Sequence, residues 1–493
     1  MPTPHPLAAP AVHGLEREWA RRFPELSRPA APARTPAPRV LALDADLAAD
    51  LGLDPASLRA EEGVRFLTGE SAPADAPPVA QVYAGHQWGV FRPLLGDGRA
   101  ALLGERRAAG DGRLREIHLK GIGPTSMSRV DGYATVGPML REFALSASMH
   151  ALGVPTTRAL AVVATGAPRR LDGVELPGAV LARTASSHVR FGSFEYVRAQ
   201  GDRALLARLA DHVIERSHPS AADARHPHRA LLAAVVDSTA ALTAAWMSLG
   251  FVHGVLSTDN VLVSAETIDY GPCAFLDAYE PGAWFSSIDR DGRYAYERQP
   301  SIMRWNLERL GVAIAPLLAA GEDEGEGAAA EIVAGFDARY RSHRDAAFRA
   351  KLGLDDRTDG AVARALADAA LALLDEHGVD FTGFWRDLAA AADGDERAVR
   401  ARFLGPVPAL DAWFAAWRAQ VPRADRIRGA NPVHIPRNHL VEEALDAAVD
   451  GDLGPFDALL EVLRHPFDER GADRRYALPA PAGSPRHRTF CGT

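Results

Sequence analysis

The chain has 493 residues, of which 47% are hydrophobic and 24% charged, and its formal net charge is -9 at pH 7. A chain of this length and apolar content can bury a large core, which excludes wholesale disorder. The acidic balance and the lack of a long basic run argue against nucleic acid as the main partner, because phosphate contacts need clustered Lys and Arg.

The N-terminus, the apolar runs and the cysteine content predict a cytoplasmic protein. The first 23 residues carry charges early and contain no uninterrupted apolar core, so we do not expect a signal peptide. We also expect no membrane span, because we find no apolar run of about 18 residues. The two cysteines, Cys273 and Cys491, provide neither a disulfide scaffold nor a Cys-rich zinc site.

The first part of the chain is predicted to combine loops with short strands. Ser27–Val40 is rich in Pro and Ala and predicts an extended connector, and Glu70–Ala80 predicts another loop. Gly96–Glu105 and Leu114–Gly123 contain apolar runs that predict two antiparallel strands. The turn between these strands is expected at the Gly-rich stretch Arg106–Arg113.

A helix is predicted next, at Gly137–Val154, and it is expected to end at Gly153. Its spacing places one set of residues on a common face: Met139, Phe143, Ala147 and either His150 or Ala151. Ala159–Gly166 and Gly178–Ala185 predict further strands.

The sequence from Asp202 onward is Ala-rich and predicts mainly helices, interrupted by an acidic, Gly-rich surface loop at Gly321–Glu331. A strand-rich part followed by a helix-rich part predicts an α+β chain with two lobes and a ligand-binding cleft between them. The expected parts are an N-terminal extension (1–80), an N-lobe (81–185), a C-lobe (186–400) and a C-terminal extension (401–493).

The stretch His253–Pro272, HGVLSTDNVLVSAETIDYGP, has the spacing of a kinase catalytic loop followed by a DFG-like segment. Asn260 is the seventh residue after His253, where kinases have a metal-binding Asn. The second residue after His253 is Val255, where kinases have the catalytic Asp, and valine cannot accept a proton. The stretch therefore indicates either an inactive kinase or an enzyme that transfers a different group.

Asn260 and Asp269 are the candidate metal ligands, because Mg²⁺ prefers hard oxygen donors from one or two side chains. The segments Val261–Ser264 and Glu266–Asp269 are expected to form a short hairpin that brings the two ligands together. Asp259 directly precedes Asn260 and is a candidate proton acceptor for a hydroxyl near the metal. The alternative is that Asp259 only braces the loop through backbone hydrogen bonds.

Lys120 ends a strand-like run and Glu142 follows 22 residues later on the predicted helix. In a kinase, a strand lysine holds nucleotide phosphates and pairs with a glutamate on the next helix. The chain has no G-x-G-x-x-G loop before Lys120, and the turn Gly96–Arg99 stands in the corresponding region. Arg183 and Arg190 add cations, more than transfer of a γ-phosphate would need.

Seven blocks in chain order are similar to the selenoprotein O family of kinase-like proteins, over most of the chain: YAGHQWGVFRPLLGDGRA, IHLKGIGPTSMSRVDGYA, LREFALSASMHALGVPTTRALAVV, SSHVRFGSFE, HGVLSTDN, IDYGPCAFLDAY and NPVHIPRNHLVEEAL. The resemblance implies a bilobal, protein-kinase-like α+β fold with extensions at both ends. It also implies that ATP binds in a flipped orientation and that AMP is transferred to Ser, Thr or Tyr hydroxyls of proteins, this chain included. Pyrophosphate would leave, and Mg²⁺ or Mn²⁺ would serve as the metal.

The resemblance also implies roles for individual residues. Asp259, Lys120 and Glu142 would be the catalytic residues, with Asp259 as proton acceptor and Glu142 paired with Lys120. Asn260 and Asp269 would hold the metal. The nucleotide would be bound by a larger set: Gly96, Gly98, Arg99, Lys120, Asp131, Gly132, Arg183, Arg190 and Asp269.

Two further features of the chain, Tyr133 and the two cysteines, bear on phosphate contacts and on regulation. Many family members have an extra residue and an Arg where this chain has Tyr133, so phosphate contacts there are expected to differ. Family members are thought to form a regulatory disulfide between the C-terminal tail and a cysteine after the DFG-like segment. Cys491 and Cys273 occupy these positions here.

Two other functions remain open from the residues alone. The first is conventional phosphoryl transfer, against which Val255 argues. The second is a noncatalytic, redox-sensitive ATP-binding scaffold, against which the retained pair Asn260 and Asp269 argues. His434 and His439 lack further ligands nearby in sequence, so we expect them to be structural rather than metal-binding.

Overall fold

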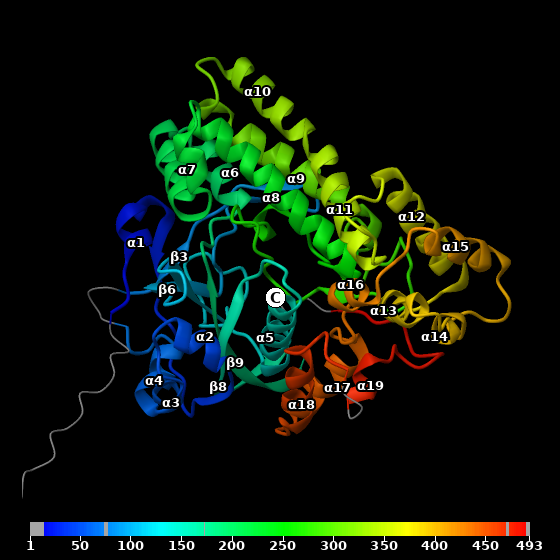
Figure 1. The fold of residues 1–493 in the computed structure, drawn as a ribbon. Coiled ribbons are helices and arrows are strands. Elements are labelled where there is room, and N and C mark those ends of the chain that lie inside the picture. Colours follow the sequence, from blue (N-terminus) through cyan, green and yellow to red (C-terminus); the bar gives the residue numbers. More distant parts are fainter. Residues whose placement is uncertain (1–13, 73–76, 172, 470–472, 490–493) are drawn as a thin grey trace, which may run out of the picture.

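The centre of the fold is one antiparallel sheet of seven strands, in the order β1-β3-β6-β7-β9-β8-β2 (Figure 1). The computed structural model describes residues 14–72, 77–171, 173–469 and 473–489. The strands of the sheet are β1 (Ser27–Pro29), β2 (Arg39–Leu43), β3 (Val79–Gln81), β6 (Ala100–Arg107), β7 (Leu114–Lys120), β8 (Arg158–Leu171) and β9 (Val174–Ala185). Two small sheets pair β4 (Gly85–Gln87) with β5 (Val90–Arg92) and β10 (Phe251–Val252) with β11 (Ala274–Phe275).

The helices occupy the first part of the chain sparsely and the rest densely. The helices that precede the last two strands of the sheet along the chain are α1 (Glu18–Arg22), α2 (Ala45–Asp50), α3 (Pro55–Arg59), α4 (Glu61–Leu67) and α5 (Val136–Ala151). After the sheet come α6 (Phe191–Gln200), α7 (Arg203–Ser217), α8 (Pro227–Leu249), α9 (Gln299–Ile314), α10 (Glu322–Ala334) and α11 (Phe336–Lys351). The last are α12 (Gly360–His377), α13 (Phe381–Ala392), α14 (Arg397–Arg400), α15 (Pro408–Arg418), α16 (Ala424–Ala430), α17 (Asn438–Val449), α18 (Gly454–Leu463) and α19 (Arg474–Ala477). The predicted α+β class is confirmed.

The strands predicted from the apolar runs are present and pair as antiparallel neighbours. β6 and β7 pair with Ala100 opposite Lys120, and β7 also pairs with β9, so that His118 lies opposite Arg183. The predicted connector Ser27–Val40 contains β1 and the first two residues of β2, and these two strands form the opposite edges of the sheet. The sheet therefore includes strands from before residue 81.

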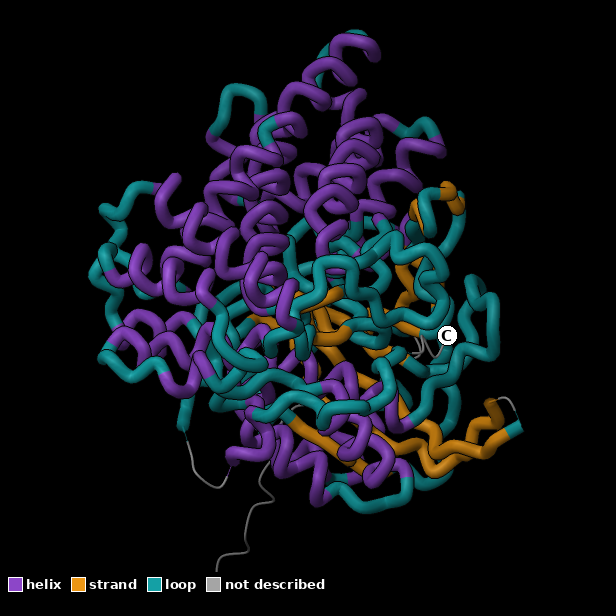
Figure 2. The backbone as a smooth tube through the Cα atoms, turned by 90° about the vertical axis from the view of Figure 1, so that its right-hand side faces the viewer, coloured by secondary structure: helices purple, strands orange, loops and turns teal. Residues whose placement is uncertain are grey.

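The sheet is buried on both faces, which explains its continuous apolar runs. Val162 and Leu181 pack in a core with α5, whereas Ala161 and Val163 pack in a second core with α2 and α4. Alternate residues of one strand therefore serve two cores. Figure 2 shows the sheet in the lower part of the molecule, with the long helices stacked above it.

The helix predicted at Gly137–Val154 is α5, and Gly153 follows its end with φ of +77°. Met139 and Phe143 of the predicted apolar face are buried, Ala147 is half-buried and His150 is exposed. The other faces of α5 are also covered, by β8 and β9 and by the C-terminal helices α17 and α18. A helix fixed on several sides is a rigid support for the residues it carries.

α8 is the long apolar helix of the helical part, and the expectation that no such apolar segment exists was wrong. By length and composition α8 could cross a membrane, but 61% of its most apolar window is buried inside the protein. It contacts α9, α10 and α11 side by side (Figure 1). These contacts are typical of a core helix in a helical bundle.

Two local predictions were wrong. Gly321–Glu331 is not a surface loop, because α10 begins at Glu322. Its first turn holds Glu322, Asp323 and Glu324, which favour a helix N-terminus through the helix dipole. The Ala-rich remainder buries Ala329 and Val333 against the core, so packing outweighs the cost of glycine in the helix.

The hairpin expected between Val261–Ser264 and Glu266–Asp269 is also absent. Leu262 instead forms an isolated bridge with Arg190, and Thr267 forms one with Thr156. Each short segment therefore pairs with a different part of the chain, and Ala265 between them takes a positive φ of 57°.

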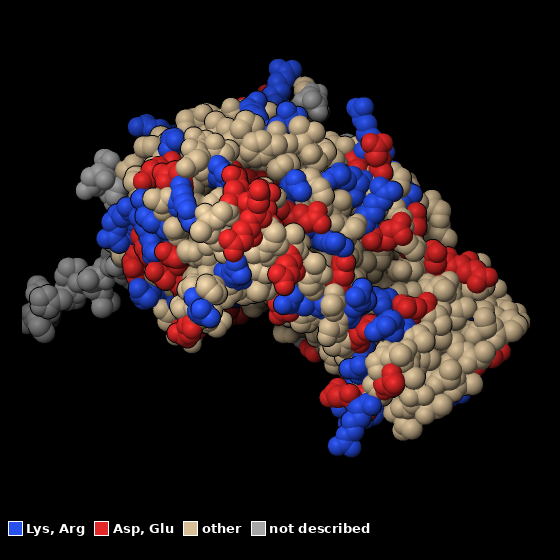
Figure 3. Space-filling model, turned by 90° about the horizontal axis from the view of Figure 1, so that it is seen from above, with Lys and Arg blue, Asp and Glu red and all other residues tan. Residues whose placement is uncertain are grey.

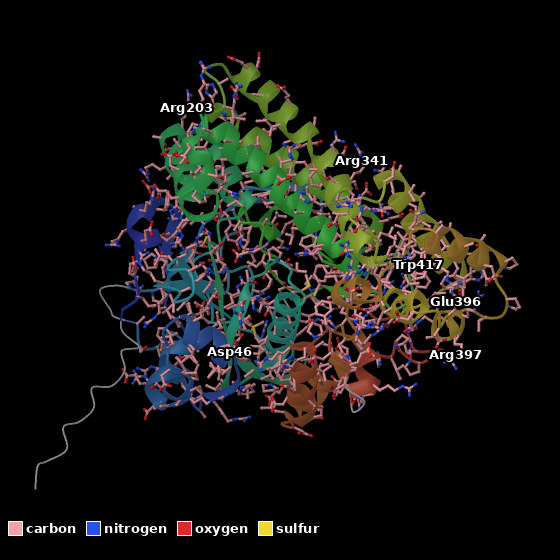
Figure 4. The ribbon with its side chains drawn as sticks, viewed as in Figure 1. Asp46, Arg203, Arg341, Glu396, Arg397 and Trp417 are labelled. Atoms are coloured by element: carbon pink, nitrogen blue, oxygen red, sulfur yellow. The ribbon has the colours of Figure 1, made fainter. Side chains whose placement is uncertain are left out.

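The outer helices form a second hydrophobic core around aromatic side chains. Trp385, Trp413 and Trp417 are buried there, and Figure 4 labels Trp417, which belongs to α15. The chain then returns to the centre, where the buried Arg437 lies 2.7 Å from Asp277 and 2.6 Å from Asp380. On the face drawn in Figure 3, basic and acidic side chains alternate without an extended basic patch.

Candidate active site

A pocket of about 480 Å³ lies between the sheet with α5 on one side and the loops that follow α8 on the other. Residues far apart in sequence meet in this pocket. Its lining includes most of the predicted site residues: Gly96, Gly98, Arg99, Lys120, Glu142, Arg183, Arg190, Asp259, Asn260 and Asp269.

Lys120 is the last residue of β7 and faces Glu142 on α5. Its Nζ atom lies 2.6 Å from Glu142 Oε2 and 2.7 Å from Asp269 Oδ1. The side chains of Lys120 and Glu142 are 10% and 2% exposed, so this ion pair is shielded from solvent. The predicted contact between Lys120 and Glu142 is confirmed.

Two arginines complete the cluster around Asp269. Arg183 on β9 donates from Nη1 to Glu142 Oε1 at 2.7 Å and to Asp269 Oδ1 at 2.9 Å. Arg190, which precedes α6, lies 3.2 Å from Asp269 Oδ2 and donates to the Asp259 backbone carbonyl at 2.6 Å. Three cations from three elements therefore converge on one carboxylate.

These cations set the charge state of the pocket. Burial alone would raise the pKa of Asp269, but Lys120, Arg183 and Arg190 outweigh it and hold that pKa well below its ordinary value. Burial is likewise outweighed at Glu142, where Lys120 and Arg183 lower the pKa. Both carboxylates are therefore charged at neutral pH and face three cations. The excess of positive charge favours a phosphate-bearing ligand.

The loop with Asp259 and Asn260 is a 3₁₀ turn, η3 (Thr258–Asn260), and hydrogen bonds fix it to its surroundings. Asn260 Nδ2 donates to the Val255 carbonyl at 3.0 Å, which orients the carboxamide. His253 Nε2 lies 3.0 Å from the Ile268 carbonyl, and burial lowers the pKa of His253 to about 4. The imidazole is therefore neutral at pH 7 and its Nε2–H donates to Ile268, joining the start of this loop to the DFG-like segment.

Asp259 is 6% exposed and is held by two side chains. Ser257 Oγ donates to Oδ1 at 2.6 Å, and Gln87 Nε2 donates to Oδ2 at 2.9 Å. Burial raises the pKa of Asp259, and these two hydrogen bonds only partly oppose it. A raised pKa makes the carboxylate a stronger base, which suits it to accept a proton.

Asp97 and Gln87 are site residues that the sequence reasoning missed. Asp97 lies between Gly96 and Gly98 and is buried, and its carboxylate accepts hydrogen bonds from Gln81 N and Tyr83 Oη and contacts His118. Its position between two predicted ligand-binding glycines could have drawn attention to it. Nothing local to Gln87 indicated its contact with a residue 172 positions away.

Gly96 has a structural reason to be glycine. Its φ is +62°, and a Cβ atom would lie 2.1 Å from Met127 Sδ. Only glycine adopts that turn at low cost while the loop approaches Met127 so closely. The turn therefore depends on both the conformation and the small size of this residue.

Asp131 and Gly132 do not line the pocket, although their neighbours Arg129 and Val130 do. The Asp131 carboxylate lies 2.9 Å from Arg169 Nη2 and also accepts a hydrogen bond from Tyr133 N. Tyr133 is 40% exposed. In this structure Asp131 therefore braces its own loop.

The donor set of Asn260 and Asp269 fits a divalent cation, because a carboxamide and a carboxylate are hard oxygen ligands on one wall of the pocket. Lys120, Arg183 and Arg190 occupy the Asp269 oxygens, so a metal would have to share or displace these contacts. Among the described ranges, the one cluster of three or more His, Cys or acidic ligand atoms is Glu18, His212 and Glu215, away from this pocket.

Cys273 follows the DFG-like segment and is fully buried. Burial raises the pKa of its thiol to about 12, and Sγ donates to the Tyr270 carbonyl at 3.1 Å. Cys491 lies outside the described residues. Thr489, two positions before it, donates from Oγ1 to the Pro272 carbonyl at 2.8 Å, directly beside Cys273.

Curated relatives match the chain over almost its whole length. Proteins named "Protein nucleotidyltransferase YdiU" are 53% identical over 492 residues in Mycolicibacterium paratuberculosis, covering 99% of this chain and 100% of the relative. The corresponding protein of Pseudarthrobacter chlorophenolicus is 50% identical over 491 residues, covering 99% of each chain. That of Cereibacter sphaeroides (strain KD131) is 49% identical over 469 residues, covering 94% and 96%.

The α+β fold, the cation-rich pocket and these relatives define an enzyme of the protein nucleotidyltransferase class. A family model described as "Protein adenylyltransferase SelO" matches residues 15–464. The chain belongs to this family, so the resemblance that the sequence motifs indicated is confirmed.

Proposed function

We propose that this enzyme transfers AMP from ATP to Ser, Thr or Tyr hydroxyls of proteins, with itself among the acceptors, and that it binds ATP in a flipped orientation. The fold proposed for this reaction is bilobal and protein-kinase-like, with lobes at 81–185 and 186–400 and extensions at 1–80 and 401–493. A strand lysine paired with a glutamate on the next helix supports it, since kinases share this pair.

The proposed step is a displacement at the α-phosphorus. The acceptor hydroxyl oxygen forms a bond to that phosphorus, and the bond from the α-phosphorus to the oxygen that leads to the β-phosphate breaks. Asp259 takes the hydroxyl proton, and pyrophosphate leaves with the bonding electrons. The raised pKa of Asp259 and its two anchoring hydrogen bonds support this role.

The remaining roles concern charge. Asn260 and Asp269 would hold Mg²⁺ or Mn²⁺, which would neutralise charge at the reacting phosphate. Lys120, Arg183 and Arg190 would bind the phosphates, with Glu142 orienting Lys120. Arg99 and the Gly96–Gly98 turn would also bind the nucleotide. Asp131 and Gly132 do not line the pocket in this structure, so they would contact the nucleotide only after their loop moves toward it.

The observation that carries the proposal is that Val255 and Asp259 line the same pocket. Val255 occupies the position of the kinase base and cannot act as one, whereas Asp259 is buried, held in place and shifted toward higher pKa. This arrangement argues against a conventional phosphotransferase. The converging cations and the retained Asn260 and Asp269 argue against a noncatalytic ATP-binding scaffold.

Labelled ATP distinguishes these functions. We expect label from α-³²P ATP to become covalently bound to protein in the presence of Mg²⁺ or Mn²⁺, and label from γ-³²P ATP to appear only in pyrophosphate. Autoradiography of denaturing gels and intact mass, with a gain of one adenylate, measure this result. Protein-bound γ-label would support phosphoryl transfer, and ATP binding without any transfer would support a scaffold.

We also propose that Cys273 and Cys491 form a regulatory disulfide in this enzyme, whose location we expect to be cytoplasmic. Thr489 is hydrogen-bonded to the residue before Cys273, which supports this pairing. The buried, high-pKa thiol of Cys273 should react slowly unless its surroundings open. Peptide mapping after mild oxidation should show a Cys273–Cys491 linkage, and two free thiols under those conditions would rule it out.

A further inference from the structure

We propose that a groove beside the active-site pocket docks an acidic segment of the polypeptide that receives the nucleotide. The inference rests on the proposed function, because it names the class of protein segment that the same site accepts. The groove has a volume of about 540 Å³ and lies between the β4–β5 hairpin, the loop at 288–293 and the start of α9. We call it the hairpin groove.

The hairpin groove is continuous with the active-site pocket. Trp88 and Ile288 line both, so they form the boundary that the two spaces share. Gln87, the residue before Trp88, donates to the Asp259 carboxylate at 2.9 Å, so one wall of the groove is tied to the proposed base. A polypeptide segment in the groove would therefore lead directly into the active-site pocket.

Exposed apolar side chains lie at this boundary and on the adjoining hairpin. Trp88 and Ile288, which line the boundary, are 37% and 50% exposed. Val90 and Phe91 of β5 and the nearby Leu94 are 54%, 38% and 53% exposed. Exposed apolar side chains that lie next to one another are typical of surfaces that bind a partner. They give a polypeptide an apolar contact in addition to any charge.

The hairpin is also held in one position. The Trp88 ring lies 4.9 Å from that of Tyr294, and Trp88 N donates to Tyr294 Oη at 3.3 Å. His86 N donates to Thr258 Oγ1 at 2.7 Å. An anchored surface loses little conformational entropy when a partner binds, which favours its use in recognition.

The charges of the groove select an anionic partner. Its cations are Arg290, Arg293 and Arg298, and its acids are Asp289 and Asp291. The Asp289 carboxylate accepts hydrogen bonds from the backbone N–H groups of Arg293 and Tyr294, both at 2.9 Å. Arg290 makes no hydrogen bond or ion pair with any other residue that the structure describes. The described contact of the Arg298 guanidinium is a hydrogen bond to the Asp291 backbone carbonyl, at 3.4 Å. In a chain of net charge -9, a groove with three arginines and two aspartates, one of which is already hydrogen-bonded, favours carboxylates on the partner.

The test compares two polypeptide probes that differ in charge. A fluorescent random Glu–Tyr copolymer and a fluorescent random Lys–Tyr copolymer are titrated with the full chain at low salt, and anisotropy reports binding. The groove variant is Arg290→Glu with Arg298→Glu. The matched control reverses two exposed arginines that do not line the groove, Arg203→Glu with Arg341→Glu, whose positions Figure 4 labels. Each variant is first checked for the wild-type unfolding temperature.

We expect the Glu–Tyr copolymer to bind more tightly than the Lys–Tyr copolymer, and the groove variant to weaken Glu–Tyr binding by about tenfold or more. The control variant should weaken it by less than about twofold, because neither of its arginines lines the groove and it changes the net charge of the chain by the same amount as the groove variant. Equal binding of both copolymers, or equal loss in both variants, would overturn the proposal.

Label transfer is scored separately from binding, so that the two proposals can fail independently. Charge-selective binding of the Glu–Tyr copolymer without covalent α-label would leave the docking groove intact and refute AMP transfer. Covalent α-label on other proteins or on the enzyme itself, without preference between the copolymers, would leave AMP transfer intact and refute the acidic docking segment.

Discussion

Replacing Asp259 with Asn is expected to lower the rate of AMP transfer by about 10²–10⁴-fold, the usual contribution of a general base. The amide is isosteric with the carboxylate: its oxygen can accept from Gln87 Nε2 and its NH₂ group can donate to Ser257 Oγ, so the loop should keep its shape. ATP affinity should therefore change little. Initial rates with α-labelled ATP and equilibrium ATP binding measure the two quantities. The matched control is Asp450→Asn, an exposed residue at the end of α17, which should keep the wild-type rate.

The variant Gln87→Leu tests the proposed role of Asp259 as proton acceptor in a second way. Gln87 stabilises the charged form of Asp259, so its loss should raise the pKa of Asp259 further. The rate of transfer rises with pH as the base loses its proton, and the acidic limb of the pH–rate profile should move to higher pH. An unmoved limb in Gln87→Leu, or a wild-type rate in Asp259→Asn, would mean that Asp259 only braces the loop.

Replacing Asp269 with Asn should reduce the free energy of unfolding at pH 7 by about 3–5 kcal/mol, the range for breaking a buried ion pair. Lys120, Arg183 and Arg190 converge on this carboxylate. The variant leaves Lys120 and Arg183 with Glu142, and Arg190 with a more distant contact to Asp97 at 3.9 Å. Metal-dependent transfer should be lost as well. Urea unfolding measures the stability. The control Asp393→Asn removes an exposed pair with Arg428, and its cost should stay below about 1 kcal/mol.

The effect of Asp269→Asn should depend on pH in one direction. The pKa of Asp269 in the folded chain is well below the value of about 3.9 for an unfolded aspartate, so the unfolded chain binds its proton first as the pH falls. The stabilisation by Asp269 is therefore complete above about pH 5 and declines as the pH falls below about 4. The stability difference between wild type and variant should shrink over that range. A difference that stays constant or grows in acid would contradict the assigned ionisation.

Local sequence patterns predicted the elements that carry Lys120 and Glu142. The strand and the helix follow from apolar spacing within about 20 residues. The kinase-like spacing then predicted that Lys120 and Glu142 form an ion pair, which the structure shows at 2.6 Å. Local patterns failed at Gly321–Glu331, where glycine and acidic residues suggested a loop. There the burial of Ala329 and Val333 against neighbouring helices stabilises α10, and a single segment does not reveal its neighbours.

The sequence by itself determined the order of motifs, the family to which they belong, the α+β class and most of the residues that line the candidate pocket, because these depend on residue type and short spacing. Only the tertiary structure decided that Arg183 and Arg190 both reach Asp269, that Gln87 supports Asp259, and that Asp131 turns to Arg169. It alone revealed the hairpin groove, whose walls come from residues about 200 positions apart. Such contacts arise when distant segments pack to bury apolar surface, and the free energy of that packing belongs to the whole chain.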